Sequence, residues 1–405
     1  MPSPVGVATV TKEGVMTIPS DAIGQAILDR LGVEPVIQAG GPNTKHSGSR
    51  PHPESLAAMR FASQHFFQMD ELLLAAGKDI ARMIGVPAAT ITAGAGAGLV
   101  VQAAAAVARD KQERIAQLPN TDGLPNELIL QRGHRFGYER LYLVAGTKFI
   151  QVGTRDLCTP RDVKKAINSR TAGIIHLESP FLSDGMVPLP ELAEIAHSHN
   201  LPVLCDAASD LPPRSNLTRF VNEGADLVSF SGGKTIRGLQ SSGLLLGTEE
   251  WVEYARLNNF PNSGIARGQK VSREQIFGLI AALEVFLAGN EEHESIKYQE
   301  QMVHIVDRIA NIPGIDARVE HDPPNHRIPS AVVYFTDDWR GPDRMEIQRR
   351  LLAGNPRVYV QILGLSGELY VDPMNLEEGQ HKIVAERLNE TLLEASMGSR
   401  TTNSS

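Results

Sequence analysis

One lysine of the chain lies in a short run of small residues between two apolar runs. Lys234 follows Ser231-Gly-Gly, and the apolar run 243–246 comes shortly after it. This arrangement predicts a tight turn that presents the lysine at the end of a strand. A lysine amine shifts its pKa readily on burial and forms Schiff bases with carbonyl compounds. Lys234 is therefore our first candidate for covalent catalysis.

An aspartate stands at the end of an earlier apolar run. Asp206 closes the run 203–206, and the next run, 227–230, leads to Lys234. Pyridoxal phosphate (PLP) needs an acid for its pyridinium nitrogen and a lysine for its aldehyde, and two successive strands would supply both. The pattern predicts PLP as the cofactor, with Lys234 and Asp206 as the catalytic and cofactor-binding pair.

A run of alternating glycines, 94–98, follows a short apolar run and opens an alanine-rich helix; we call it the glycine turn. Its backbone amides could approach an anion, and the helix dipole favours negative charge there. Close packing of a helix on a sheet would equally explain the small residues. The pattern fits neither the Walker lysine motif nor the nucleotide-binding Gly-x-Gly-x-x-Gly motif. The candidate phosphate-binding amides are those of Gly94, Ala95, Gly96 and Ala97.

The composition is that of an ordinary water-soluble protein. Its 405 residues are 42% hydrophobic and 21% charged, which is enough for one large and one smaller domain. The net charge of −8 disfavours a broad nucleic-acid-binding face and favours a small-molecule substrate. We find no membrane-spanning run and no signal peptide, so the cytoplasm is expected. The two cysteines, Cys158 and Cys205, are expected to be packing residues, and no metal site is predicted.

Strand-like and helix-like segments alternate through the first two thirds of the chain. The predicted strands are 89–92, 128–131, 149–152, 173–177, 203–206, 227–230 and 243–246. Predicted helices include 98–109, 188–200 and 272–288. This alternation predicts an α/β fold with a mostly parallel, seven-stranded sheet in a large domain.

A second pattern begins after residue 290. Predicted helices at 291–312, 344–352 and from 377 alternate with predicted strands at 318–320, 331–335, 358–361 and 368–371. We therefore expect an N-terminal segment, 1–45, that packs with a small C-terminal α+β domain, 291–397. The large PLP-binding domain would span 46–290, and the polar tail 398–405 is expected to be disordered.

Several local strings resemble a known family, fold-type I PLP-dependent enzymes. The resemblance is to the branch that contains selenocysteine synthase (the seryl-tRNA selenium transferase) and D-glucosaminate-6-phosphate ammonia-lyase, and it covers about residues 35–385. The ammonia-lyase looks closer, because Gln240-Ser-Ser-Gly243 and Leu211-Pro-Pro213 are in its style. The strings are Val36-Ile-Gln-Ala-Gly-Gly-Pro-Asn-Thr44 with Ser47-Gly-Ser49, Ile80-Ala-Arg-Met-Ile-Gly85, Thr92-Ala-Gly-Ala95, Gln131-Arg-Gly-His134, Leu201-Pro-Val-Leu-Cys-Asp206-Ala-Ala208, Phe230-Ser-Gly-Gly-Lys234, and Arg267-Gly-Gln-Lys270 with Glu274.

The resemblance implies the fold-type I PLP-dependent transferase fold and a role for each candidate. Lys234 would hold PLP as a Schiff base, then act as general base at the substrate α-carbon and as acid toward the leaving group. Asp206 would keep the pyridine nitrogen protonated. Ser231 would add a hydroxyl to the phosphate site, although it could equally be a turn residue. His134 would stack on the cofactor ring, although a lone histidine could also be structural.

Two groups of polar residues are candidates for binding substrate or phosphate. Arg267 and Lys270 precede a long predicted helix, and in the resembled family this string lies near the cofactor, often across a dimer interface. A polar cluster in a Gly/Pro-rich segment could close over an anionic substrate, or could be a bare surface loop. This cluster comprises Lys45, His46, Ser47 and Arg50.

The sequence departs from the resembled family at two positions. Met374 follows Asp372-Pro373 where relatives tend to have arginine, and Gln361 stands where a further arginine is expected. Neither side chain can bind a carboxylate or phosphate bidentately as arginine does. The substrate's anionic group must therefore be held differently, or be a different group.

The expected activity is that of a PLP-dependent lyase of the ammonia-lyase type. It would catalyse α,β-elimination on a β-hydroxy or β-substituted amino acid or amino-sugar acid, giving a 2-keto product and ammonia. The alternatives are β-replacement on aminoacyl-tRNA, as in the selenium transferase, racemisation and retro-aldol cleavage. A degenerate homologue without turnover is a further alternative. The resemblance also implies a homo-oligomer.

Overall fold

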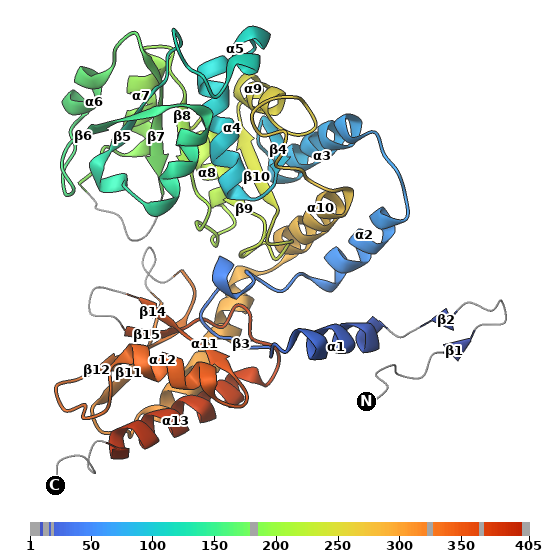
Figure 1. Cartoon of the computed structure of the whole chain (residues 1–405). Coiled ribbons are helices and arrows are strands. Elements are labelled where there is room, and N and C mark those ends of the chain that lie inside the picture. Colours follow the sequence, from blue (N-terminus) through green and yellow to red (C-terminus); the bar gives the residue numbers. More distant parts are fainter. Residues whose placement is uncertain are drawn as a thin grey trace.

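The computed structural model describes residues 9–10, 16–17, 20–178, 185–321, 327–363 and 368–398. Figure 1 shows a large α/β body with a smaller α+β body beside it, and a helix and hairpin from the start of the chain project to one side. The projecting elements are α1 (Ser20–Leu31), β1 (Thr9–Val10) and β2 (Met16–Thr17). The predicted tail, apart from Gly398, lies outside the described residues.

A seven-stranded sheet forms the centre of the large body. Its order is β4-β10-β9-β8-β7-β5-β6, and β10 alone among these strands runs antiparallel to its two neighbours. The strands are β4 (Ala88–Thr92), β5 (Glu127–Gln131), β6 (Lys148–Val152), β7 (Thr171–Leu177), β8 (Val203–Asp206), β9 (Leu227–Ser231) and β10 (Gly243–Gly247). Each contains one of the predicted runs. The prediction of a mostly parallel, seven-stranded α/β sheet is confirmed.

Helices cover both faces of this sheet. They are α2 (Pro53–Ser63), α3 (Met69–Ile84), α4 (Ala95–Ala108), α5 (Gln112–Gln117), α6 (Pro160–Ala166), α7 (Leu189–His197), α8 (Asn216–Asn222), α9 (Glu249–Asn258) and α10 (Arg273–Ala288), with short 3-10 helices at Arg132–His134 and Gly137–Ala145. Neighbouring strand residues face opposite layers, so Leu128 belongs to one hydrophobic core and Ile129 to the other. Cys158 and Cys205 are both free and buried.

Helix α4 is the most deeply buried helix of the large body, with every residue from Ala97 to Ala108 shielded from solvent. Alanine makes this possible because it carries little bulk and favours the helix. The predicted helix 98–109 begins three residues too late, since the helix starts at Ala95. The second half of the glycine turn is therefore the first turn of the helix, and its backbone amides point out of the helix end.

The small body contains a second sheet, of order β11-β12-β15-β14, and three helices. Its elements are α11 (Glu291–Ile309), β11 (Ile315–Glu320), β12 (Ser330–Phe335), α12 (Arg344–Ala353), β13 (Val358–Tyr359), β14 (Gln361–Leu363), β15 (Glu368–Val371) and α13 (Gln380–Gly398). The predicted strand 358–361 is wrong as a single strand. Val360 is buried in the small-body core, and the chain changes partners there.

The start of the chain contributes to this small body. Strand β3 (Ile37–Gln38) pairs in parallel with β13, and Ala39 lies in the small-body core. The expected packing of the whole segment 1–45 on the small body stays a prediction. The exact divisions at residues 45, 290 and 397 stay predictions. In the described parts of the chain, no helix is long and apolar enough to cross a membrane.

Candidate active site

Lys234 lies in the turn that joins β9 to its antiparallel neighbour β10. Backbone bonding closes this turn, because the Gly232 amide donates to the Ser242 carbonyl at 2.8 Å. Gly233 leaves no room for a side chain, since an added Cβ would collide with the backbone of Gln240. Close packing of the turn thus explains the two glycines before the lysine.

The amine of Lys234 is partly buried and lies among groups from the segment that follows β8. It donates a hydrogen bond to the Ser209 hydroxyl. Burial lowers the pKa of Lys234, and the charges of Asp206 and Asp210 oppose that shift. A lowered pKa leaves more of the amine neutral at a given pH, and the neutral amine is the form that acts as nucleophile and base.

Asp206 ends β8, next to β9, and its carboxyl group is buried. The Ala208 amide donates to Oδ1 of Asp206 at 3.1 Å. Burial raises the pKa of Asp206, while the Ala208 hydrogen bond and the charge of Lys234 oppose the rise. A buried carboxylate needs a cationic partner to stay ionised, and a protonated ring nitrogen is a partner of this kind. The fold brings Asp206 and Lys234 to one edge of the sheet, as the strand order suggested.

The glycine turn leads from β4 into α4 at this same edge. Gly94 has a φ of +88° and precedes the helix, which starts without a side-chain cap from the described residues. The amides of Ala95, Gly96 and Ala97 therefore lack acceptors within the helix. Free amides at the positive end of a helix form an anion site, so this turn suits a phosphate group.

Ser231 lies beside the helix start. Gly243 pairs with Ser231 on one side and with Thr92, the last residue of β4, on the other. A Cβ at Gly243 would come within 2.5 Å of the Gly94 carbonyl carbon, so the turn is pressed against β10. This pairing puts Ser231 near the start of α4, where its hydroxyl could also contact a phosphate bound by the helix. That role for Ser231 stays a prediction.

His134 is buried at the carboxyl end of β5, as its position after the strand suggested. The Leu177 amide donates to its Nδ1 at 3.4 Å, so the proton of the neutral ring is on Nε2. Burial and the nearby His176 lower the pKa of His134 to about 3. A neutral aromatic ring at this edge can stack on a flat cofactor, whereas a charged imidazolium would repel its pyridinium.

His176 connects His134 to two charged groups that sequence reasoning missed. The two rings meet edge to face, with centroids 4.9 Å apart, and Nε2 of His176 lies 3.2 Å from Glu178. Glu178 also pairs with Arg219 at 3.1 Å. Burial disfavours ionisation of Glu178, but the bonds and charges of His176 and Arg219 outweigh it and lower its pKa to about 2. The contacts from His176, which Glu178 and Arg219 hold in turn, thus orient the His134 ring.

The segment with the predicted polar cluster packs directly on the Lys234 turn. The Ser49 amide donates to the Gly233 carbonyl at 3.0 Å. Lys45 and Ser47 are both exposed, and Ser47 has a left-handed φ of 72°. The structure therefore brings this segment to the candidate site, while the roles of Lys45 and Ser47 stay predictions.

The other two residues of the polar cluster already have partners. His46 stacks on Tyr359 with ring centroids 3.5 Å apart. Arg50 forms an ion pair with Glu377. Both contacts join the segment to the small body, so these side chains connect the two bodies beside Lys234. The binding of substrate by His46 and Arg50 stays a prediction.

Arg267 and Lys270 precede α10 and are exposed. The Arg267 guanidinium lies 5.2 Å from the centre of the Phe260 ring. None of the contacts in the described part of the chain joins either residue to Lys234 or Asp206. Their proposed binding of substrate or phosphate therefore stays a prediction.

Gln361 and Met374, the two departures from the resembled pattern, lie in the small body. Met374 is buried, and its amide donates to Asp372 at 2.8 Å. Gln361 is partly buried in β14 and pairs with Tyr370. Neither residue supplies a cation, so an anionic substrate group needs another partner.

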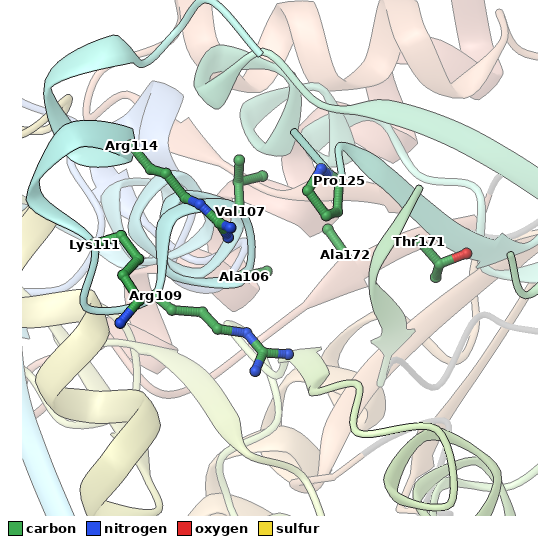
Figure 2. A pocket seen from close by; sticks show the side chains of 8 residues that line it. All are labelled: Ala106, Val107, Arg109, Lys111, Arg114, Pro125, Thr171 and Ala172. Carbon is green, nitrogen blue, oxygen red and sulfur yellow. The ribbon is translucent and has the colours of Figure 1, made fainter. Parts of the chain in front are cut away.

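A separate cavity of about 280 Å³ opens at the far end of α4 (Figure 2). It is lined by Ala106, Val107, Arg109, Lys111, Arg114, Pro125, Thr171 and Ala172. Helix α4 rises roughly 1.5 Å per residue, so its 14 residues place this cavity about 20 Å from the glycine turn. The cavity therefore does not belong to the Lys234 site.

Comparison with known proteins now decides the family. Residues 80–311, more than half of the chain, match the family model for SelA, L-seryl-tRNA selenium transferase. The chain belongs to the SelA family. This match confirms the sequence-based resemblance, and family membership makes the chain a PLP-type enzyme with the fold-type I architecture.

Individual relatives place the chain more closely within the SelA family. A Streptomyces 5'-C-glycyluridine monooxygenase-decarboxylase is 32% identical over 372 residues, which cover 90% of this chain and 91% of that protein. The D-glucosaminate-6-phosphate ammonia lyase of Salmonella typhimurium is 28% identical over 370 residues, covering 90% and 97%. The L-seryl-tRNA(Sec) selenium transferase of Haemophilus influenzae is 30% identical over only 174 residues, covering 39% and 36%.

The solved structure of D-glucosaminate-6-phosphate ammonia-lyase gives the same result in three dimensions. It superposes with a TM-score of 0.80 at 28% identity and covers 91% of this chain and 98% of that chain. The expected position near the ammonia-lyase branch is confirmed. This homology supports lyase chemistry of the PLP type.

The residues of the site fit this cofactor. Lys234 offers an amine with a lowered pKa, and Asp206 offers a buried carboxyl group that accepts a hydrogen bond from the Ala208 amide. The uncapped start of α4 offers backbone amides, and His134 offers a neutral ring. An aldehyde, a pyridine nitrogen, a phosphate and a ring face would each meet a group of suitable chemistry.

Proposed function

We propose that this enzyme eliminates the β-hydroxyl, or another β-substituent, from an amino acid or amino-sugar acid and releases a 2-keto product and ammonia. One observation carries the proposal: the amine of Lys234, whose pKa is lowered by burial, donates a hydrogen bond to Ser209, three residues after Asp206. The 28% identity to an ammonia lyase along nearly the whole chain supports the same chemistry.

PLP, when bound, supplies an electron-withdrawing ring that stabilises negative charge at the substrate α-carbon. Lys234 would hold its aldehyde, and the amides at the start of α4 would hold its phosphate, with help from Ser231. Asp206 would keep a proton on the ring nitrogen, because a cation beside this buried carboxylate relieves its desolvation. His134 would cover one face of the ring.

Proton transfer is the task of Lys234. As a neutral amine it would take the proton from the substrate α-carbon, and as an ammonium it would return a proton to the leaving hydroxyl. The Ser209 hydroxyl, which accepts a hydrogen bond from Lys234, would keep the amine directed toward the reacting carbons. Asp206 and Asp210 favour the ammonium form, so both forms of the lysine are accessible.

A substrate screen tests this proposal. PLP-loaded protein would be incubated with phosphorylated and unphosphorylated β-hydroxy amino acids and amino-sugar acids, and ammonia and 2-keto acid would be measured together. We expect equal amounts of both products from at least one compound, and none from Lys234→Ala. Product formation that persists in Lys234→Ala would refute the assignment.

Oxygen-dependent decarboxylation is a second candidate, since the chain is 32% identical to a monooxygenase-decarboxylase along most of its length. The same screen separates the two. Elimination releases ammonia without consuming oxygen or forming carbon dioxide. An oxygen electrode and a carbon dioxide assay on each compound would therefore identify the second reaction.

A reaction on aminoacyl-tRNA is a third candidate, and a binding experiment tests it. Binding of tRNA requires neutralisation of several phosphates and falls steeply with salt. A gel-shift titration with bulk tRNA at micromolar protein, at two salt concentrations, should show no salt-sensitive complex. The expected homo-oligomeric state can be measured on the same samples by light scattering.

A further inference from the structure

An arginine from the small body reaches the segment beside Lys234. Arg327, shortly before β12, donates a hydrogen bond to Oδ1 of Asp210 and another, at 3.3 Å, to the Pro212 carbonyl. Asp210 is fully buried, and only 14% of the Arg327 side chain is exposed. This pair joins residues 117 positions apart in the chain.

The pair is incomplete on both sides. Nε of Arg327 and Oδ2 of Asp210 are buried, and neither has a partner among the described residues. A buried polar atom without a partner costs about 1–3 kcal/mol, and more when it is charged. An N–H donor left open on a buried guanidinium indicates that an acceptor belongs there.

The Arg327–Asp210 pair lies beside Lys234, which connects the open Nε–H of Arg327 to the proposed site of reaction. Ser209 accepts the hydrogen bond of Lys234, and Asp210 is the next residue. Lys234 and Asp206 both act electrostatically on Asp210. These residues lie at the carboxyl edge of the parallel strands, where ligands bind in open α/β sheets.

Other arginines near this edge already have partners. Nε of Arg237, three residues after Lys234, donates to the Arg50 carbonyl at 2.9 Å. Arg219 pairs with Glu178 and Glu223, and Arg50 pairs with Glu377. Gln361 and Met374 supply no cation. Arg214, four residues after Asp210, also has a buried nitrogen without a hydrogen-bond acceptor, but Glu291 lies 3.4 Å from that nitrogen. Nε of Arg327 has no acceptor among the described residues.

Building on the proposed function, we propose that Arg327 binds the carboxylate of the substrate. A planar guanidinium binds a carboxylate through two parallel hydrogen bonds, and Arg327 can present its open Nε–H together with one terminal nitrogen. The substrate would then be an α-amino acid or amino-sugar acid, with its amine toward Lys234 and its carboxylate toward the small body.

Asp210 would share the arginine with the incoming carboxylate. Burial raises the pKa of Asp210 to about 7, while the charges of Arg327 and Lys234 oppose the rise and those of Glu178 and Asp206 add to it. Asp210 can therefore take up a proton near neutral pH, so that the arginine need not hold two anions at once. Protonated Asp210 could donate a hydrogen bond to the substrate carboxylate.

Binding of matched ligand pairs tests this proposal. Serine and ethanolamine differ only by the carboxylate. Glucosaminate and glucosaminitol are both open chains and differ only at C1, where the first carries a carboxylate and the second a hydroxymethyl group. Dissociation constants would be measured by titrating the absorption spectrum of PLP-loaded wild type, Arg327→Gln and Arg327→Lys. Arg308→Gln is a matched control, because that exposed small-body arginine pairs with Glu386.

We expect wild type to prefer the acid of at least one pair, and Arg327→Gln to weaken binding of that acid about 10- to 100-fold. Binding of the matched amine should change less than about twofold. Arg327→Lys keeps the charge but loses the planar guanidinium, so its dissociation constant for the acid should lie between those of wild type and Arg327→Gln. Arg308→Gln should bind both ligands as wild type does.

Two results would overturn the assignment. One is wild-type protein that prefers the acid in neither pair. The other is a loss on Arg327→Gln or Arg327→Lys that is equal for acid and amine. Neither depends on ammonia release, so failure of this inference is distinguishable from failure of the proposed elimination. An unchanged visible spectrum in each variant would show that the cofactor is still bound.

Discussion

Lys234 donates a hydrogen bond to the hydroxyl of Ser209, which lies three residues after Asp206. Lys234 and Asp206 are thus connected through the short segment 206–209 at the end of β8. Ser209→Ala removes the acceptor, and a typical hydrogen bond contributes about 0.5–1.5 kcal/mol. We expect kcat for ammonia release to fall about 2- to 10-fold with the bound-cofactor spectrum retained. Ser209→Thr, which keeps the hydroxyl, should retain most of the activity.

Asp206→Asn should have a larger effect, because it removes the charge that would hold a proton on the cofactor nitrogen. Loss of one such preorganised electrostatic group lowers kcat by about 10²–10³-fold. Asp226→Asn is the matched control, since Asp226 is also buried but bonds to Val203 and His197 at the opposite edge of the sheet. Steady-state kinetics should show a large loss in the first variant alone. Equal losses in the two would mean that Asp206 serves only folding.

His134→Ala and His134→Phe separate stacking from hydrogen bonding. An aromatic pair contributes about 0.5–1.5 kcal/mol, so His134→Ala should weaken PLP binding about 2- to 10-fold. Phenylalanine keeps the flat ring and should restore most of the affinity. Equilibrium titration of apoprotein with PLP would measure this. Phenylalanine that binds as poorly as alanine would show that the imidazole nitrogens, rather than the ring face, matter.

The pH dependence of substrate binding should report on Asp210. Its pKa is raised to about 7, so below pH 7 the group is mostly neutral and leaves Arg327 to the substrate. Above pH 7 it is charged, competes for Arg327 and repels a carboxylate. The dissociation constant of serine should therefore rise as the pH passes through 7, in excess of the change for ethanolamine. Asp210→Asn should abolish that excess, and an excess that persists would contradict the role of Asp210.

Local sequence patterns were sufficient for the sheet and for the placement of Asp206 and Lys234 at one edge of it. Apolar runs mark each strand of the seven, and alternation of strands with helices makes the sheet parallel, so Asp206 and Lys234 arrive at one edge. The glycine turn reaches that edge by the same logic. The strand 358–361 could not be predicted correctly, because burial of Val360 depends on partners far away in the chain.

The residues that sequence reasoning missed depend on contacts between distant elements. Ser209 lies within three residues of Asp206, so its position after the strand was an available signal. His176 and Glu178 alternate at the end of β7, but only the fold shows that they meet His134. Arg327 carries no local signal, since its contact with Asp210 requires the small body to pack on the large one.

The central claim is that Lys234 holds PLP, and chemical trapping tests it most directly. Purified protein would be loaded with PLP, reduced with borohydride, digested and analysed by mass spectrometry. We predict a pyridoxyl group on the peptide that contains Lys234, and the loss of both this label and the visible absorption band in Lys234→Ala. A label on another lysine, or a wild-type protein that takes up no PLP, would contradict the account.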